Sequence, residues 1–324
     1  MKNQIKISIT LFAVIVLSIA VKAQSAAADN SGGVSISAYV SDQVTGLPNE
    51  AKEMLKNKLS QLVTQNGISN GALGSRFIIT PNINVLTKDI LPGLPAMHAM
   101  NLEFTFYIGD GIAGRKFASK SIEVRAVGTN ETKAYIDGIK NIKPNDPAIA
   151  AFLAEGKKKI IDYYTTNCES IVKTAQSAAS SGNYEAAIAQ LIGVPDACKP
   201  CYDKAMAAAE PMYKKYLDQQ CSIKLTQARA AWNANQNSEG AASAGQLLAS
   251  IDPSAACYNE SVSLNKEISQ RMKEIGNKEW DYKMKEREGN VEIEKARVNA
   301  YRDIGVAYYL SKRNVVVYNI LGWW

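Results

Sequence analysis

The segment GNYEAAIAQLIGVPDACKPC, residues 182–201, contains the signals that determine how the C-terminal half of the chain folds. Gly182 and Asn183 end one helical pattern, and residues 184–191 form a short helix. Val194-Pro195 ends that helix, because proline lacks the amide hydrogen that a continuing helix needs. A new helical pattern begins at the cysteines. The segment therefore predicts a short helix that returns beside a longer one.

The same order of signals occurs twice along residues 146–312. A long helical pattern spans about 148–180 and another about 201–232, and each is followed by a break, a short helix and a proline. Gln190-Leu191 matches Gln246-Leu247, and Cys201-Tyr202 matches Cys257-Tyr258. This is the pattern of an imperfect helical repeat. The stretch GNYEAAIAQL resembles the second helix of a tetratricopeptide repeat, so we expect an all-α, tetratricopeptide-like domain of helical hairpins.

The five cysteines are Cys168, Cys198, Cys201, Cys221 and Cys257. In an exported chain they favour disulfides over metal ligands. At about 1.5 Å per residue, Cys168 lies roughly 21 Å along its helix from Gly182, and the return path reaches the same height at Cys198 and Cys201. Cys168 should therefore face Cys198 or Cys201, and by the same reasoning Cys221 should face Cys257.

The motif Cys198-Lys199-Pro200-Cys201 also has the spacing of thiol–disulfide oxidoreductase active sites. Such a site needs the motif at a helix start after a buried strand, whereas a short helix and a loop precede it here. We interpret it as a structural clip with one spare cysteine. Thiol–disulfide oxidoreductase activity through this motif is kept as an alternative function.

Residues 34–145 mix strands and helices. VSISAYV alternates as a half-buried strand does, and RFIITPNINVL, NLEFTFYIG and KSIEVRAVG indicate three more strands. Helical spacing occurs over 48–65 and again after Thr129. The order β-α-β-β-β-α predicts an α+β domain with a mainly antiparallel sheet and two helices on one face.

This half resembles the small α/β domains of bacterial envelope proteins of the TolB, CsgG and FlgT type. The resemblance covers residues 34–142 and is carried by LPNEAKEMLKNKLSQLVTQNG with RFIITPNI, and by SIEVRAVGTNETKAYIDGIKNI. It implies an assembly or interaction module rather than a catalyst. The chain departs from CsgG in lacking a lipidated cysteine and paired long amphipathic hairpins, which argues against a channel.

Two further motifs resemble catalytic ones. Gly109-Asp110-Gly111-Ile112-Ala113-Gly114 fits the dinucleotide fingerprint, but a strand rather than a helix follows it, so we interpret it as a glycine-rich hairpin. His98 is the one histidine of the chain and has no nucleophile motif beside it. We therefore expect no catalytic residues, no metal and no cofactor.

The N-terminus, residues 1–23, predicts a cleaved secretory signal: two lysines at its start, then an uncharged apolar run, and small residues at the cleavage point. Residues 24–33 would be a flexible leader. Removing Lys2, Lys6 and Lys22 lowers the formal net charge from +6 to +3, which does not favour nucleic acid as a partner. No later stretch is long and apolar enough to span a bilayer.

Residues 313–324, RNVVVYNILGWW, predict a short strand that is apolar on both faces. We expect it to pack internally, with a partner or membrane-interface anchor as the alternative. The aromatic side chains that we considered for partner binding are Tyr163, Tyr164, Tyr184, Tyr202, Trp232, Trp323 and Trp324.

These observations predict a non-enzymatic protein of the periplasm or the periphery of the outer membrane. Its function would be protein–protein interaction within an envelope assembly, with peripheral outer-membrane association as a further expectation. An accessory subunit of a secretion or outer-membrane complex is the second alternative.

Overall fold

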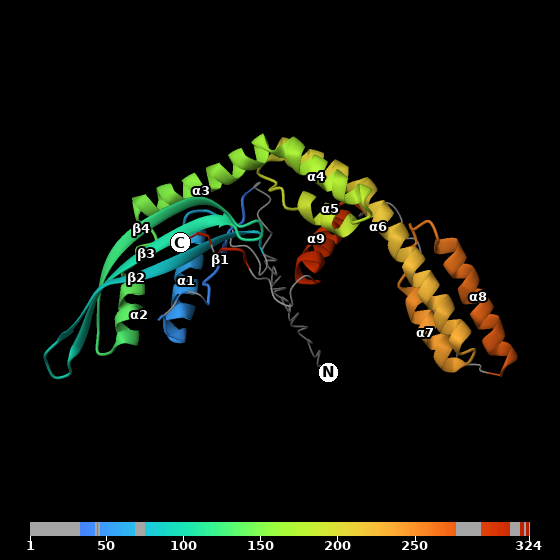
Figure 1. Ribbon diagram of the computed structural model, residues 1–324, viewed down its shortest axis with the longest axis horizontal. Coiled ribbons are helices and arrows are strands. Elements are labelled where there is room, and N and C mark those ends of the chain that lie inside the picture. The colour runs from blue at the N-terminus through green and yellow to red at the C-terminus, as the bar shows by residue number, and fades with distance from the viewer. Residues whose placement is uncertain are drawn as a thin grey trace, which may run out of the picture. The chain divides into compact units, whose positions relative to one another are not determined.

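The computed structural model (Figure 1) describes residues 33–42, 44, 46–68, 75–276, 293–311, 318–320, 322 and 323. The predicted signal peptide, all of the predicted leader except Gly33, and Trp324 lie outside the described residues, as do 312–317 and 321 of the predicted C-terminal strand.

The sheet has four strands in the order β1-β2-β3-β4. Their bounds are β1 (Ser37–Ala38), β2 (Phe77–Leu91), β3 (Met97–Asp110) and β4 (Arg115–Gly128). β1 runs parallel to β2, while β2, β3 and β4 form an antiparallel meander. The α+β class and the mainly antiparallel sheet are thus confirmed. The first strand is much shorter than VSISAYV, and the next two are longer than the alternating stretches that predicted them.

Three helices share one core with the sheet: α1 (Asn49–Gln65), α2 (Glu131–Asn141) and α3 (Pro147–Thr166). Close contacts at glycines place α2 and α3 on the same face of β3, because Gly138 lies against Leu102 and Gly156 against Ile108. Side chains two residues apart share a face of a strand. Asp146 caps α3 by accepting a hydrogen bond from the Ala148 amide at 2.8 Å, as its position before Pro147 predicts.

The helical region continues through six more helices of the described chain. They are α4 (Cys168–Ser180), α5 (Tyr184–Leu191), α6 (Lys199–Ala234), α7 (Ser238–Ala249), α8 (Tyr258–Glu274) and α9 (Ile293–Ser311). The predicted continuous helix over 148–180 is wrong in one respect, because it divides at Asn167. The Asn167 side-chain amide donates to the Tyr163 carbonyl at 2.8 Å, a local bond that competes with the helix backbone.

The two helical hairpins differ in their cores. The first, from α4 to the start of α6, belongs to the same hydrophobic core as the sheet, which extends from Val34 to Met212 and includes Tyr301 of α9. The second, formed by the rest of α6 with α7 and α8, has a separate core that contains Trp232. The predicted limits 34–145 and 146–312 stay predictions, and the core crosses the boundary between them.

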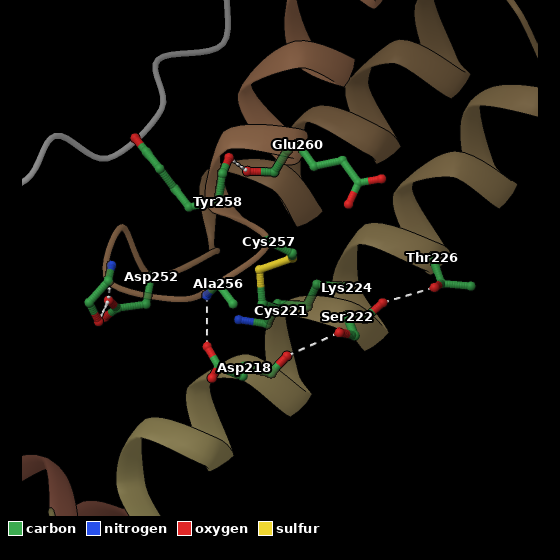
Figure 2. Close-up of a disulfide and its surroundings, with 12 residues drawn as sticks. Asp218, Cys221, Ser222, Lys224, Thr226, Asp252, Ala256, Cys257, Tyr258 and Glu260 are labelled. Atoms are coloured by element: carbon green, nitrogen blue, oxygen red, sulfur yellow. Dashed lines mark hydrogen bonds between the residues drawn. A yellow bond between two sulfur atoms is a disulfide. The ribbon is translucent and has the colours of Figure 1, made fainter. Parts of the chain in front are cut away.

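A disulfide holds each hairpin. Cys168 of α4 bonds to Cys201 of α6, and Cys221 of α6 bonds to Cys257 at the start of α8, with sequence separations of 33 and 36 residues. These are pairs that the helical spacing predicts. Loops of this size stabilise a fold by about 3–4 kcal/mol in the chain-entropy account. Figure 2 shows the second bond, beside which the Asp218 carboxylate accepts a hydrogen bond from the Ala256 amide at 2.7 Å.

The C-terminal segment returns to the sheet. Ile320 and Trp323 are buried with Ile78 and Tyr107, on the side of the sheet opposite the helices. Residues 318–320 form no strand, so the predicted strand is wrong for this described part. The segment is held instead by single contacts, such as the Asn319 amide donating to the Gly111 carbonyl at 2.6 Å.

Candidate functional site

The two cysteines of the motif at the start of α6 are not bonded to each other. Cys201 is used in the disulfide to Cys168, and the remaining thiol, Cys198, is buried. Its Sγ lies 3.5 Å from the Ile161 carbonyl, to which it donates. Burial raises the pKa of the Cys198 thiol, so at neutral pH it is the protonated form that predominates. A nucleophilic cysteine needs an accessible, low-pKa thiolate.

We therefore predict that Cys198 is unreactive in the folded protein. With alkylating reagent in excess at neutral pH, native protein should be modified at least about tenfold more slowly than protein unfolded in denaturant. Mass spectrometry after timed quenching measures both rates. Rapid modification of the native protein at Cys198 would contradict the structural interpretation of the motif and would favour the oxidoreductase alternative.

The glycine-rich turn between β3 and β4 positions a buried carboxylate. Asp110 accepts from Arg76 Nε at 2.6 Å and from the Tyr164 hydroxyl at 3.2 Å. Its other oxygen accepts from the amides of Ile112 and Ala113 at 3.0 and 2.8 Å. Both carboxylate oxygens therefore have partners from the protein itself, which is the arrangement of a structural buried charge.

The cluster also joins distant elements. Arg76 precedes β2 and Tyr164 lies on α3. The Tyr309 hydroxyl of α9 donates to the Ala189 carbonyl of α5 at 3.4 Å, and the charge of Arg76 acts on the pKa of this tyrosine. Burial acts to lower the pKa of Arg76, but Asp110, Tyr164 and Tyr309 together outweigh burial, so that the pKa is raised. The guanidinium thus stays charged, and we interpret the cluster as a clamp between sheet and helices.

Alkaline pH should open this clamp. Burial raises the pKa of both Tyr164 and Tyr309 above the ordinary value of about 10. Because the folded protein holds these phenol protons more tightly, their contribution to stability is complete below pH of about 10 and decreases as pH rises further. In a titration to high pH, the phenolate absorbance of these two tyrosines should therefore rise at the pH at which the circular dichroism of the folded protein is lost. Ionisation of all tyrosines near pH 10 with the fold intact would contradict this.

The aromatic residues considered for partner binding separate into two groups. Tyr164, Trp232 and Trp323 are buried in the core, and partner binding through them stays a prediction. Tyr163, Tyr184 and Tyr202 are half-buried. Tyr163 packs on Phe117, and the Arg115 guanidinium lies 4.3 Å from the centre of its ring. These three stay predictions, and they are not gathered in one cluster.

A cluster of metal ligands is also not assembled in the described part of the chain. There, no three His, Cys, Asp or Glu side chains gather as a metal site would require. His98 lies in β3, paired with Ile90 of β2 and Gly128 of β4. A shallow hollow on α4 is lined by polar side chains such as Glu169 and Lys173. None of the described helices is both long and apolar enough to cross a bilayer.

One surface of the described chain does stand out, and we term it the hairpin end: residues 85–102, where β2 and β3 are joined. In Figure 1 it extends beyond α2. Of the nine exposed large apolar side chains in the described part of the chain, five belong to it, and a sixth lies beside it on β4. They are Val85, Leu86, Ile90, Leu91 and Leu94, with Val127.

The sequence did not reveal this surface, because the Pro-rich stretch around residue 94 resembles a loop that leads into a strand. The strands in fact pair as far as Leu91 and Met97, so the loop is carried to the end of a long antiparallel ribbon. Leu94 is fully exposed and Ile90 is 65% exposed. A cluster of exposed apolar side chains is typical of a contact surface.

Comparison with known proteins finds little. No protein-family model matches the chain, and no curated protein matches it in sequence. Two solved structures align with part of it: a minor lipoprotein from Acinetobacter baumannii and a putative lipoprotein from Caulobacter crescentus. Each is 13% identical, with a TM-score of 0.22. The first alignment covers 39% of this chain and 91% of the other, and the second covers 40% and 87%.

Proposed function

We propose that the protein is a non-enzymatic, exported module of the bacterial cell envelope that works by binding, and that the hairpin end is its contact surface. The observation that carries the proposal is the gathering of six exposed apolar side chains at and beside one end of the sheet. Water-exposed apolar clusters destabilise a chain in solution and persist where a contact uses them.

The remaining features support binding rather than chemistry. The Asp110 carboxylate is satisfied by protein groups, and the free thiol Cys198 is buried. Two disulfides favour an oxidising compartment, as the signal-like N-terminus does. We therefore propose that the protein takes part in an assembly in the periplasm or at the periphery of the outer membrane, and that this assembly includes a protein partner. We further propose that the helical hairpins are a tetratricopeptide-like repeat, and that the protein is an accessory subunit of a secretion or outer-membrane complex.

A shortened hairpin tests the proposed contact surface. Asp89 and Ala99 are paired across β2 and β3, so replacing residues 90–98 with an Asn-Gly turn removes the end and keeps the register. The variant should fold, because the removed side chains lie largely outside the core. It should no longer remain with the envelope fraction after cell disruption, whereas Ile223→Asp, at an isolated exposed position on α6, should behave as the original chain.

Retention of the shortened variant in the envelope fraction, at the level of the original chain, would contradict the proposed contact surface. Thermal unfolding of the purified variant is measured in parallel, so that misfolding is recognised.

A further inference from the structure

The hairpin end differs from its surroundings in charge as well as in exposure. Residues 90–102, ILPGLPAMHAMNL, contain no Asp, Glu, Lys or Arg. Charged side chains return on both sides, at Lys88, Asp89 and Glu103, and Lys88 pairs with Glu131 of α2 at 2.6 Å. The outer part of the hairpin end, residues 90–102, therefore has no charges, while Lys88 and Asp89 lie at its base. This outer part can enter an apolar medium without stripping water from an ion.

The loop that closes the hairpin end has few backbone donors. Pro92 and Pro95 have no amide hydrogen, and Leu91 pairs with Met97 at the last step of the ribbon. Unpaired amides are costly in hydrocarbon, which is why irregular backbone is rare there. The two prolines reduce the number of unpaired amides in the loop at the outermost point of the hairpin, and so reduce the cost of placing this loop in hydrocarbon.

The outer edge of β2 is poorly suited to a partner that adds a strand. Within the described residues, β1 pairs only with Ile78 and Ile79, so the rest of that edge has no neighbouring strand. It contains Pro81, a register shift between Val85 and Thr87, and Lys88. Prolines, bulges and lysines are the means by which natural sheets prevent edge pairing.

The hairpin end also lacks the side chains that dominate protein–protein interfaces. Residues 85–102 include no Trp, Tyr or Arg, the types enriched among the side chains that contribute most to such binding. Its large exposed apolar side chains are aliphatic and stand on a projecting end. A fluid hydrocarbon layer needs no matching shape, and Leu, Ile and Val are among the side chains that enter it most readily.

A second copy of this chain is a poorer fit to the same surface. A contact between two hairpin ends would use about six side chains from each, compared with roughly 20–30 residues a side in a stable interface. Nor does the polar hollow on α4, lined by Glu169, Ser170 and Lys173, offer apolar cover.

We propose that the hairpin end inserts into the surface of a lipid bilayer. Ile90, Leu91 and Leu94 would lie among the acyl chains, with the Lys88–Glu131 pair at the level of the head groups. This rests on the proposed function, because it names the envelope component that the contact surface meets. The attraction comes from aliphatic side chains, so it depends on neither anionic lipid nor low salt.

Vesicle flotation tests the inference with the full chain lacking residues 1–23. The protein is mixed with vesicles of phosphatidylcholine alone, and with vesicles that also contain phosphatidylglycerol, at low and at high salt. The original chain should float with both kinds at both salt concentrations. Leu94→Asp and Ile90→Asp should each weaken binding at least about tenfold, while the matched variant Ile223→Asp, also at an exposed aliphatic side chain, should change nothing.

Other outcomes would overturn the inference in distinguishable ways. Binding only to anionic vesicles, lost at high salt and unaffected by Leu94→Asp, would show adsorption through surface lysines. Absence of vesicle binding, together with a protein cross-linked to position 94 in cells, would overturn the lipid partner and leave the proposed function standing. If position 94 contacts neither lipid nor protein, both proposals fail. Circular dichroism of each variant confirms that folding is unchanged, as expected at fully exposed Leu94.

Discussion

Replacing Asp110 with alanine is expected to lower the free energy of unfolding by about 3–5 kcal/mol. The Asp110 side chain is 2% exposed, and its loss would leave the largely buried Arg76 guanidinium without its counter-charge. The variant also loses the acceptor for the Ile112 and Ala113 amides in the turn. Because the Asp110 carboxylate and Tyr164 are buried and Arg76 is largely so, water is a poor replacement for the carboxylate beside the guanidinium.

Urea unfolding followed by circular dichroism measures this change. Asp203→Ala is the matched control, because Asp203 forms an exposed i, i+4 pair with Lys199, and such pairs contribute within about 0.5 kcal/mol. Equal midpoints for Asp110→Ala and Asp203→Ala would show that the clamp between sheet and helices does not hold the fold together.

Trp323→Ala is expected to destabilise the fold by about 3–5 kcal/mol, the usual range for removing a buried Trp. The ring lies against Gly109, where an added Cβ would meet it at 2.4 Å. Its Nε1 donates to the Gly114 carbonyl at 3.1 Å, and Lys116 Nζ donates to its backbone carbonyl at 2.8 Å. The segment thus closes the small second core on the sheet.

The same unfolding measurement applies, with Leu94→Ala as the matched control: removing that fully exposed side chain should change stability by less than about 0.5 kcal/mol. Gly109→Ala tests the contact from the sheet side and should also destabilise. If Trp323→Ala leaves stability unchanged, the C-terminal segment is not part of the core, and the anchor alternative for residues 313–324 becomes the better explanation.

The helical half was largely predictable from local signals. The short helix α5 spans Tyr184–Leu191 as predicted, because a glycine and a proline mark its limits. The rise per residue along the helices predicted the disulfide between Cys221 and Cys257, and it left Cys198 and Cys201 as alternative partners of Cys168. Asn167 was missed because its effect depends on one side-chain bond to Tyr163 rather than on the apolar periodicity.

The glycine-rich turn shows what local patterns do not contain. A hairpin was predicted at 109–114 and is present, but the pattern could not show why glycine recurs there. Added Cβ atoms at Gly109 and Gly111 would collide with Trp323 and Tyr318, which lie more than two hundred positions later in the chain. The one local signal of the clamp was Asp110, a charged residue at the end of an apolar strand. Asp110 identifies the clamp only once Arg76 is known to face it.

The hairpin end was missed for a different reason. The prolines at 92 and 95 and the charges at 88 and 89 interrupt the alternation that indicates strands. Pairing with β3 nevertheless carries β2 through Lys88 and Asp89 to Leu91, just before the first of these prolines, with a register shift on the way. An extension of this kind depends on the partner strand, and it places the apolar loop where only three-dimensional structure could show it.

The most direct test of the central claim is photo-cross-linking in cells, with a photoreactive amino acid at position 94 and, as the matched control, at position 223. The account predicts cross-links to an envelope component from position 94 and none above background from position 223. Absence of products from position 94, in protein that is exported and folded, would contradict the claim that the hairpin end is the contact surface.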